Sequence, residues 1–338
     1  MIQSLTDIPS KLAVQRVLCT SLGRAQLAAA VAATWPEAEV LCNFLDLYQA
    51  ALARQSCHPM NLRITCEADD PVEPSTLDLA VFPLTFHGDA ELTRERLQAA
   101  QIGLRPGGQL WAATDNPRDH WLRSELAKLF DRVRVHATDE GVVYHGVKTS
   151  ALKKRKDFTC WLAFRDNERL LQLVTRPGVF SHRHLDTGAR CLMETMALPS
   201  GARVLELGCG AGAVACAAAS RAPGIHVLAL DSNPRAIQCT RWSAQANQLD
   251  AISTQLDAEA RCDAPGEYDY VFANPPYYSH QRISRLFIDG ATRALRPGGT
   301  LSIVTKDSDW YLAELPQSYH RIEVLALRSY FVVRAAKV

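Results

Sequence analysis

The sequence predicts two consecutive α/β domains, each built on a doubly wound, Rossmann-like, mostly parallel sheet. The chain has 338 residues, which is long for a single hydrophobic core and suits two domains of ordinary size. In its second half, short apolar segments alternate with helical patterns, as strands and helices do in parallel sheets. The two halves also contain matching segments in the same order.

These matching segments indicate a duplicated domain. Arg16-Val17-Leu18 is repeated as Arg203-Val204-Leu205 at an offset of 187 (203 − 16). Further on, residues 104–108 and 295–299 both read Leu-Arg-Pro-Gly-Gly, at an offset of 191 (295 − 104). Two matches in order, at nearly equal offsets, indicate tandem copies of one domain. We therefore divide the chain into a domain at 1–150, a basic linker at 151–159 and a domain at 160–338.

Each element of the second copy follows from local patterns. A parallel sheet is predicted from the apolar strands, and the last two strands are separated by so little that they must pair antiparallel at the sheet edge. In chain order we expect a strand at 203–207, a helix at 213–221, a strand at 226–230, a helix at 234–247, a strand at 268–273, a helix at 282–295 ending at Pro297-Gly298-Gly299, and strands at 300–304, 321–327 and 329–334.

Composition is that of a soluble globular protein, with 47% hydrophobic and 22% charged residues. The longest apolar runs, such as Ala25–Ala33, are too short to span a membrane, and the N-terminus lacks a secretory signal pattern, so we expect a cytoplasmic protein. The net charge of +1 does not by itself indicate a nucleic-acid-binding protein. The basic run at 153–156 fits either a solvated linker or an RNA contact.

The ten cysteines include no C-x-x-C pair, and several lie in apolar segments, so we expect free thiols in a reducing compartment rather than disulfides or a metal site. His182 and His184 could share one face of a strand, but no cysteine or carboxylate completes a local metal site. We interpret them as surface or target-contact histidines.

A glycine-rich loop follows the first strand of the second copy, with Glu206, Gly208, Gly210 and Gly212 at alternate positions. Glycines let the backbone turn tightly and approach a ligand closely. The loop also satisfies a dinucleotide fingerprint. However, Glu206 suits a cationic, amine-bearing ligand better than a pyrophosphate, which a helix N-terminus would bind. The pattern therefore favours S-adenosylmethionine over a nicotinamide cofactor.

Two aspartates follow the next strands. Asp231 ends one strand, where a carboxylate can accept both ribose hydroxyls of an adenosine, although Asp-Ser-Asn-Pro is also a helix-start signal. We favour the ribose role. Asp257, after the expected third strand, is a candidate partner for the adenine amino group, and a solvated loop aspartate is an equally good interpretation.

Asn274-Pro275-Pro276-Tyr277 follows the apolar strand at 268–273 and forms a rigid loop, because two prolines cannot continue a sheet interior. The planar amine of a nucleobase or amide is a poor nucleophile. The Asn274 side-chain oxygen and the Pro275 carbonyl can accept its two hydrogens, and Tyr277 can stack on the target. Asn274 cannot take a proton, so the motif predicts catalysis by positioning.

The first copy lacks these residues. Opposite 206–212 it has Cys19-Thr20-Ser21-Leu22-Gly23-Arg24-Ala25, opposite Asp231 it has Phe44, and opposite Asn274-Pro275-Pro276-Tyr277 it has Pro83-Leu84-Thr85-Phe86. We predict a methyltransferase-like domain without a cofactor site.

With these motifs, the chain resembles the two-domain bacterial ribosomal RNA guanine-N2 methyltransferases of the small subunit and their large-subunit relatives. The specific element is Pro177-Gly178-Val179-Phe180-Ser181 followed by Leu185-Asp186-Thr187-Gly188. The resemblance implies that Phe180 and Ser181 lie near cofactor and target and that Asp186 frames the cofactor pocket. It also implies cofactor contacts from the 206–212 loop and Asp231, and target contacts from Asn274, Pro275 and Tyr277.

The sequence therefore predicts methyl transfer from S-adenosylmethionine to the N2 amine of a guanine in ribosomal RNA, with 16S RNA or a ribosomal subunit as the partner. We expect a monomer without a metal or a membrane contact. Family members often have Phe where this chain has Tyr277. An adenine-N6 or protein glutamine-N5 methyltransferase therefore stays open as an alternative, and so does a non-catalytic RNA-binding assembly factor.

Overall fold

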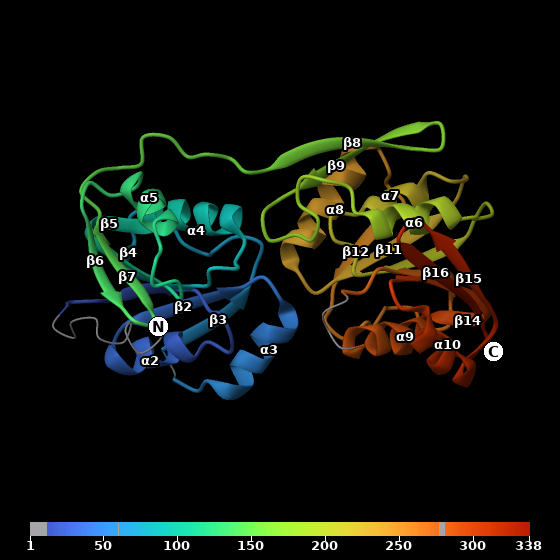
Figure 1. The fold of residues 1–338 in the computed structure, drawn as a ribbon, viewed down its shortest axis with the longest axis horizontal. Coiled ribbons are helices and arrows are strands. Elements are labelled where there is room, and N and C mark those ends of the chain that lie inside the picture. Colours follow the sequence, from blue (N-terminus) through green and yellow to red (C-terminus); the bar gives the residue numbers. More distant parts are fainter. Residues whose placement is uncertain (1–11, 60, 277–280) are drawn as a thin grey trace. The chain divides into compact units, whose positions relative to one another are not determined.

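The computed structural model describes residues 12–59, 61–276 and 281–338. The chain divides into two compact units, Met1–Phe158 and Thr159–Val338, which we call the N-terminal and C-terminal units. Figure 1 shows that each unit is built around one large sheet with helices on both faces.

The N-terminal unit has a seven-stranded sheet in the order β3-β2-β1-β4-β5-β7-β6. Its first five strands are parallel, and β7 and β6 continue the sheet antiparallel. The elements are β1 (Arg16–Cys19), α2 (Gln26–Thr34), β2 (Glu39–Phe44), α3 (Leu47–Ser56), β3 (Leu62–Cys66), β4 (Leu77–Leu84), α4 (Ala90–Gly103), β5 (Leu104–Thr114), α5 (Trp121–Ala127), β6 (Val133–Thr138) and β7 (Gly141–Val147).

The C-terminal unit repeats this order as β12-β11-β10-β13-β14-β16-β15, which confirms the predicted pair of doubly wound domains. Its elements are β8 (Cys160–Asp166), β9 (Arg169–Thr175), α6 (Thr187–Thr195), β10 (Arg203–Leu207), α7 (Ala213–Ala219), β11 (His226–Asp231), α8 (Pro234–Ala246), β12 (Ile252–Leu256), β13 (Tyr268–Ala273), α9 (Arg282–Ala294), β14 (Leu295–Thr305), α10 (Ser308–Glu314), a short 3₁₀ turn (Leu315–Gln317), β15 (Tyr319–Leu327) and β16 (Tyr330–Lys337).

The period-2 pattern of the strands explains why both faces of the C-terminal sheet are covered. On β10, Val204 packs into the core beneath α6, α7 and α8, whereas Leu205 and Leu207 point into the core with α9 on the other face. All three side chains are buried. The two cores hold the strand ends rigidly, and ligand-binding loops extend from those ends.

The predicted boundary between the helix at 282–295 and the strand at 300–304 is wrong, because β14 already begins at Leu295. Tyr268 pairs with Leu295 and Tyr270 pairs with Thr300, so the residues between are accommodated as an irregularity in the ladder. Gly298 takes the left-handed conformation that this requires, with φ of 77°. A Pro-Gly-Gly segment that looks like a break is therefore a bulge within a continuous strand.

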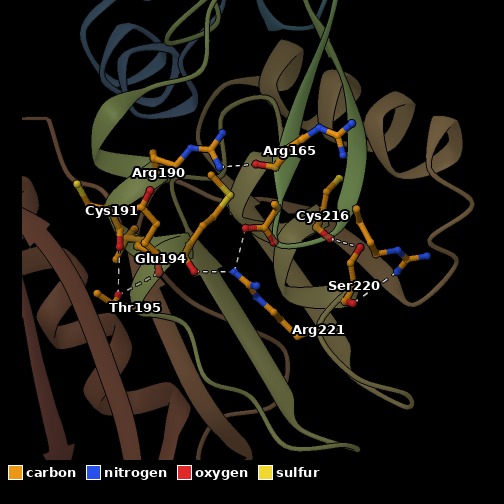
Figure 2. A network of polar contacts seen from close by, with 12 residues as sticks. Arg165, Arg190, Cys191, Glu194, Thr195, Cys216, Ser220 and Arg221 are labelled. Carbon is orange, nitrogen blue, oxygen red and sulfur yellow. Dashed lines mark hydrogen bonds and ion pairs between the residues drawn. The ribbon is translucent and has the colours of Figure 1, made fainter. Parts of the chain in front are cut away.

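A two-stranded hairpin, β8–β9, precedes the C-terminal sheet and was not predicted. Figure 2 shows the polar network that fastens it to α6 and to the end of α7. Arg221 reaches Asp166 of β8 at 3.0 Å and the Met193 carbonyl of α6 at 2.6 Å, and Arg190 donates to the Arg165 carbonyl. Burial raises the pKa of Asp166 even though Arg221 lowers it, so desolvation outweighs the attraction between the two charges.

The segment expected to be a linker lies against α4 of the N-terminal unit. The Lys156 N–H donates to Gln98 Oε1 at 2.7 Å, and Phe158 is buried. All ten cysteines are free, as predicted, and six of them are buried. No helix among the described residues is long and apolar enough to cross a membrane.

Candidate active site

The predicted site residues of the C-terminal unit follow strands that are neighbours in the sheet. Strands β12, β11, β10 and β13 lie side by side and run parallel, so their carboxyl ends meet along one edge. We call this the carboxyl edge. Glu206 lies near the end of β10 and the glycine loop at 208–212 follows that strand, while Asp231 ends β11, Asp257 follows β12 and Asn274 follows β13. The duplicated strand order thus places four predicted motifs at one edge.

The glycine loop takes a conformation that other residues rarely adopt. Gly208, Gly210 and Gly212 have φ of 75°, 54° and 84°. A Cβ on Gly212 would lie 2.9 Å from the Thr240 side chain, so packing against α8 requires that glycine. Among the described residues, a Cβ on Gly210 would meet nothing within 4 Å. At Gly210, therefore, the backbone faces open space in which a ligand can approach it.

Asp231 braces this loop. Its carboxylate accepts the Gly210 N–H and the Asn233 N–H, each at 2.9 Å. The helix cap that was the alternative role for Asp231 belongs to Asn233, whose side chain accepts from the Arg235 N–H. Asp231 is therefore fixed at the strand end by the glycine loop on one side and the start of α8 on the other.

Asp257 lies next to Asp231 along the edge. The Asp257 N–H donates to the Asp231 carbonyl at 3.0 Å. Its Oδ1 accepts from the N–H groups of Glu259 and Arg261, at 2.7 and 3.0 Å. These hydrogen bonds stabilise the loop that follows β12. The sequence suggested an adenine contact or a solvated loop aspartate at this position, and neither includes this structural role.

Glu206 is buried beneath the loop, and its Oε2 has no hydrogen-bond partner among the described residues. Burial raises the pKa of its carboxyl well above the ordinary glutamate value, the Ala215 N–H opposes that rise, and the nearby Asp231 adds to it. A buried carboxyl with an unsatisfied oxygen is costly unless a ligand supplies a donor or a positive charge.

The segment between β9 and α6 is tied to the beginning of α8. Arg235, which is buried, donates to the Pro177 carbonyl at 2.9 Å, and Asn233 donates to the Gly178 carbonyl at 2.7 Å. Ser181 and Arg183 have positive φ, 59° and 72°. Strained backbone of this kind persists where the surroundings fix it, and it concentrates at functional sites.

Asp186 and Asn274 form the central contact of the site. Asn274 Nδ2 donates to Asp186 Oδ2 at 2.8 Å, and the same oxygen accepts the Ala189 N–H at 2.8 Å as the N-cap of α6. Because Nδ2 of Asn274 donates this bond, Oδ1 is the atom of the amide that can accept a hydrogen bond. A Cβ on Gly188 would lie 2.9 Å from Asp186 Oδ2 and 3.0 Å from Asn274 Oδ1. Gly188 therefore makes room for the contact.

A pocket brings most of the predicted site residues together. It is lined by Leu173, Phe180, Ser181, His184, Leu185, Asp186, Ala189, Glu206, Gly208, Cys209, Gly210, Ala211, Ala213, Val214 and Asn274. Phe180 is 62% exposed at this pocket. Four predicted site residues do not line this pocket: Gly212, Asp231, Asp257 and Pro275. Asp231 nevertheless accepts a hydrogen bond from Gly210, which does line it. Tyr277 lies outside the described residues.

The two histidines do not share a strand face. Thr175 Oγ1 and His182 Nδ1 are hydrogen-bonded at 2.7 Å, whereas His184 is exposed and bonds to the His182 carbonyl. In the part of the chain that the structure describes, no three His, Cys, Asp or Glu side chains gather to hold a metal ion.

The equivalent loop of the N-terminal unit is closed on itself. Arg16 pairs with Glu39 as Arg203 pairs with His226, so the two copies share one register. Ser21 Oγ accepts the N–H groups of Gly23 and Ala25, both at 3.0 Å. These backbone donors are therefore already satisfied.

In the N-terminal unit, side chains also fill the space next to this loop, at the carboxyl ends of β2 and β3. Arg96 of α4 donates to the Asn43 carbonyl at 3.4 Å, and its Nε lies 3.9 Å from Asp70 Oδ2. Asn43 Nδ2 in turn bonds to Asp70 Oδ1 at 3.2 Å. The Asp70 side chain is 3% exposed and that of Arg96 is 15% exposed, so this ion pair is part of the packed interior.

The family model of the methyltransferase small domain matches residues 170–335. Ribosomal RNA small subunit methyltransferase C of Salmonella agona is 30% identical over 297 residues, which are 84% of this chain and 81% of that protein. The chain belongs to the ribosomal RNA small subunit methyltransferase C family. Membership confirms the resemblance inferred from the sequence motifs.

Other members align over a shorter stretch. The protein of the same name from Yersinia enterocolitica is 32% identical over 203 residues, which are 58% of this chain but 56% of that relative. Among solved structures, the Thermus thermophilus "16S rRNA N2 G1207 methyltransferase (RsmC) in complex with AdoMet and Guanosine" has a TM-score of 0.79 and 20% identity, and covers 100% of this chain and 91% of that one. At that identity the match supports the two-domain fold.

Several residues of the site were not singled out in the sequence. Gly188 stood in the Leu-Asp-x-Gly motif, and its spacing from Asp186 was the available signal. Arg235 and Asn233, which hold the 177–178 backbone, gave no signal because their partners lie 58 and 55 residues away.

Proposed function

We propose that this chain transfers a methyl group from S-adenosylmethionine to the exocyclic N2 amine of a guanine in ribosomal RNA, in its C-terminal unit. The observation that carries the proposal is the Asn274 amide, oriented by Asp186 at a pocket that is also lined by the glycine loop and by the buried Glu206. The names of the relatives agree with it: each is a ribosomal RNA small subunit methyltransferase, and the Thermus thermophilus protein is described with AdoMet and guanosine.

The residues present fit S-adenosylmethionine. Glu206 supplies a buried carboxylate oxygen that has no hydrogen-bond partner among the described residues, which suits the positive charge of the cofactor. Gly210 leaves open space beside its backbone, and Asp231 stands at the next strand end, where ribose hydroxyls are accepted. When bound, the cofactor supplies an electrophilic methyl group on a sulfonium sulfur.

The chain's own residues act by positioning the amine. Asn274 Oδ1 and the Pro275 carbonyl accept the two amine hydrogens, which draws the nitrogen lone pair away from the ring and toward the methyl group. The bound cofactor would supply its methyl group to this nitrogen and leave as a neutral thioether, and the amine would release one proton toward solvent. Asp186 keeps the Asn274 acceptor turned toward the target, and Tyr277 stacks on the base.

The substrate is an unpaired or extruded guanine of small-subunit RNA, because the pocket must admit the base itself. A ribosomal substrate implies that the protein works in the cytoplasm, and we expect it to do so as a monomer. The N-terminal unit, with its loop closed by Ser21 and its interior filled by the Arg96–Asp70 pair, has no role in cofactor binding and serves to position RNA.

The test combines calorimetry with label transfer. Full-length protein should bind S-adenosylmethionine but not NAD, and should transfer labelled methyl groups to the RNA of small subunits from a strain lacking the enzyme. Asn274→Ala should bind the cofactor normally and transfer little label. Label in ribosomal protein would instead favour glutamine-N5 transfer. Failure to bind the cofactor would indicate a non-catalytic RNA-binding protein.

A further inference from the structure

Positive charge is concentrated after β7, in residues 148–158, which form no helix or strand (Figure 1). We call these residues the basic segment. It contains five cations and one carboxylate, Asp157, which gives it a local net charge of +4 (5 − 1), whereas the whole chain has a net charge of +1. Residues 153–156 are all lysine or arginine, and all four are exposed.

The basic segment is held against α4 at both ends. Near its start, the Gln101 side chain donates to the Ser150 carbonyl at 2.9 Å. Near its end, the Gln98 side chain donates to the Lys156 carbonyl at 3.3 Å and accepts the Lys156 N–H at 2.7 Å. Gln98 and Gln101 are 7% and 1% exposed, and Phe158 is buried. A charged linker that is free in solution extends because its charges repel one another, and these anchors prevent that.

The cations between the anchors are not paired within the protein. The side chains of Lys153, Lys154 and Arg155 form no hydrogen bond or ion pair with any residue that the structure describes. Consecutive Cα atoms are about 3.8 Å apart, so the Cα atoms of 153 and 155 are separated by about 7.6 Å at most. That is less than the Debye length of about 8 Å at physiological salt. Salt therefore screens their mutual repulsion only in part, and an anion bound across them would relieve it.

The neighbouring elements do not neutralise this charge. Asp131, which accepts the Thr149 hydroxyl, is followed by Arg132. Arg105 at the start of β5 is paired with Asp78. The helix α4, which the basic segment contacts, carries two arginines and two glutamates: Arg94, Arg96, Glu91 and Glu95. Cations and carboxylates thus balance in each neighbour, and the positive charge of the basic segment remains.

We propose that the basic segment binds the sugar–phosphate backbone of the substrate RNA, with Lys153, Lys154 and Arg155 each contacting a phosphate. The inference rests on the proposed function for the identity of the RNA. A fixed row of cations favours a polyanion, because each phosphate that it neutralises releases condensed counterions. Such contacts supply affinity and position the RNA without reading its sequence.

The experiment measures binding of the full-length protein to a fluorescent single-stranded RNA 12-mer of mixed sequence, by anisotropy over a range of salt. The segment variant combines Lys153→Gln, Lys154→Gln and Arg155→Gln. It should reduce the magnitude of the slope of log K against log salt by about 2, which is about 0.7 for each of three phosphates on a single strand. At 0.1 M salt its affinity should be about 100-fold lower. Its melting temperature should not change, because all three side chains are exposed.

The matched control variant combines Arg24→Gln, Arg63→Gln and Arg118→Gln. It removes the same charge from exposed positions of the same unit that lie outside the basic segment. If net charge alone governed binding, both variants would lose the same slope. We expect the control variant to keep the wild-type slope. A wild-type slope in the segment variant, or equal reductions in both variants, would overturn the inference.

The two proposals fail separately. In methylation assays, the segment variant should raise the KM for small subunits and leave kcat unchanged. If RNA binding depends on the basic segment but no N2-methylguanosine forms, the RNA contact stands and the proposed function falls. If N2-methylguanosine forms and the segment variant has a wild-type KM and salt slope, the proposed function stands and the RNA contact falls.

Discussion

Replacing Asp186 by serine or asparagine separates its two roles. Its Oδ2 caps α6 through the Ala189 N–H and orients Asn274 through Nδ2, each at 2.8 Å. Serine is as good an N-cap as aspartate but is too short to reach Asn274. Asparagine retains an oxygen that can accept both bonds. Asp186→Ser should therefore keep the fold and lose the orientation of the amide, and Asp186→Asn should keep both.

The expected effect follows from the hydrogen bond itself. A hydrogen bond to a charged group contributes about 1.5–3 kcal/mol, and if that free energy holds the acceptor toward the target amine, its loss slows transfer about 10- to 150-fold. Single-turnover methylation of small subunits measures this rate. A melting curve should show an unchanged fold, and saturating cofactor, checked by calorimetry, keeps any weaker binding at the pocket that Asp186 lines out of the measured rate. A folded Asp186→Ser with wild-type turnover would refute the positioning role.

The other predictions concern the same unit. Gly188→Ala inserts a Cβ about 3 Å from both Asp186 and Asn274, so single-turnover rates should fall by about 10²-fold with little change in the melting temperature. Burial raises the pKa of Glu206, so the folded apoprotein holds a proton there that the unfolded chain has lost. Its free energy of unfolding should therefore decrease as pH rises above the ordinary glutamate range. Chemical denaturation should show this decrease with pH in the wild type and not in Glu206→Gln. Because a cationic ligand favours the charged carboxylate, Glu206→Gln should also weaken S-adenosylmethionine binding about tenfold or more in calorimetry, and an unchanged affinity would exclude a cofactor contact. Arg221→Met leaves Asp166 buried without its cation and should lower the free energy of unfolding by about 3–5 kcal/mol, measured with urea; a loss below 1 kcal/mol would mean that the network in Figure 2 does not hold the β8–β9 hairpin.

The sequence predicted the sheet and the motifs at its edge because both depend on local patterns. A glycine at a position of positive φ, such as Gly208, predicts a turn whatever packs around it. An apolar segment such as 268–273 predicts a buried strand in the same way. The matching Leu-Arg-Pro-Gly-Gly segments revealed the duplication, although the bulge that they form had to be seen in the ladder between Tyr268 and Tyr270.

Contacts between distant parts of the chain were beyond such patterns. Asp186 was expected to frame the cofactor pocket, but its bond to Asn274 joins residues 88 positions apart. The β8–β9 hairpin was missed because its position depends on partners in α6, α7 and α8, such as the Ser243 hydroxyl that accepts the Val174 N–H. Whether Tyr277 stacks on the target stays a prediction, since it lies outside the described residues.

The most direct test of the account is the identity of the methylated product. Small subunits from a strain lacking the enzyme would be incubated with the wild-type protein and S-adenosylmethionine carrying a deuterated methyl group, and their RNA digested for nucleoside mass spectrometry. The account predicts heavy N2-methylguanosine, which Asn274→Ala should nearly abolish. Heavy N6-methyladenosine, or N2-methylguanosine at equal yield from Asn274→Ala, would contradict it.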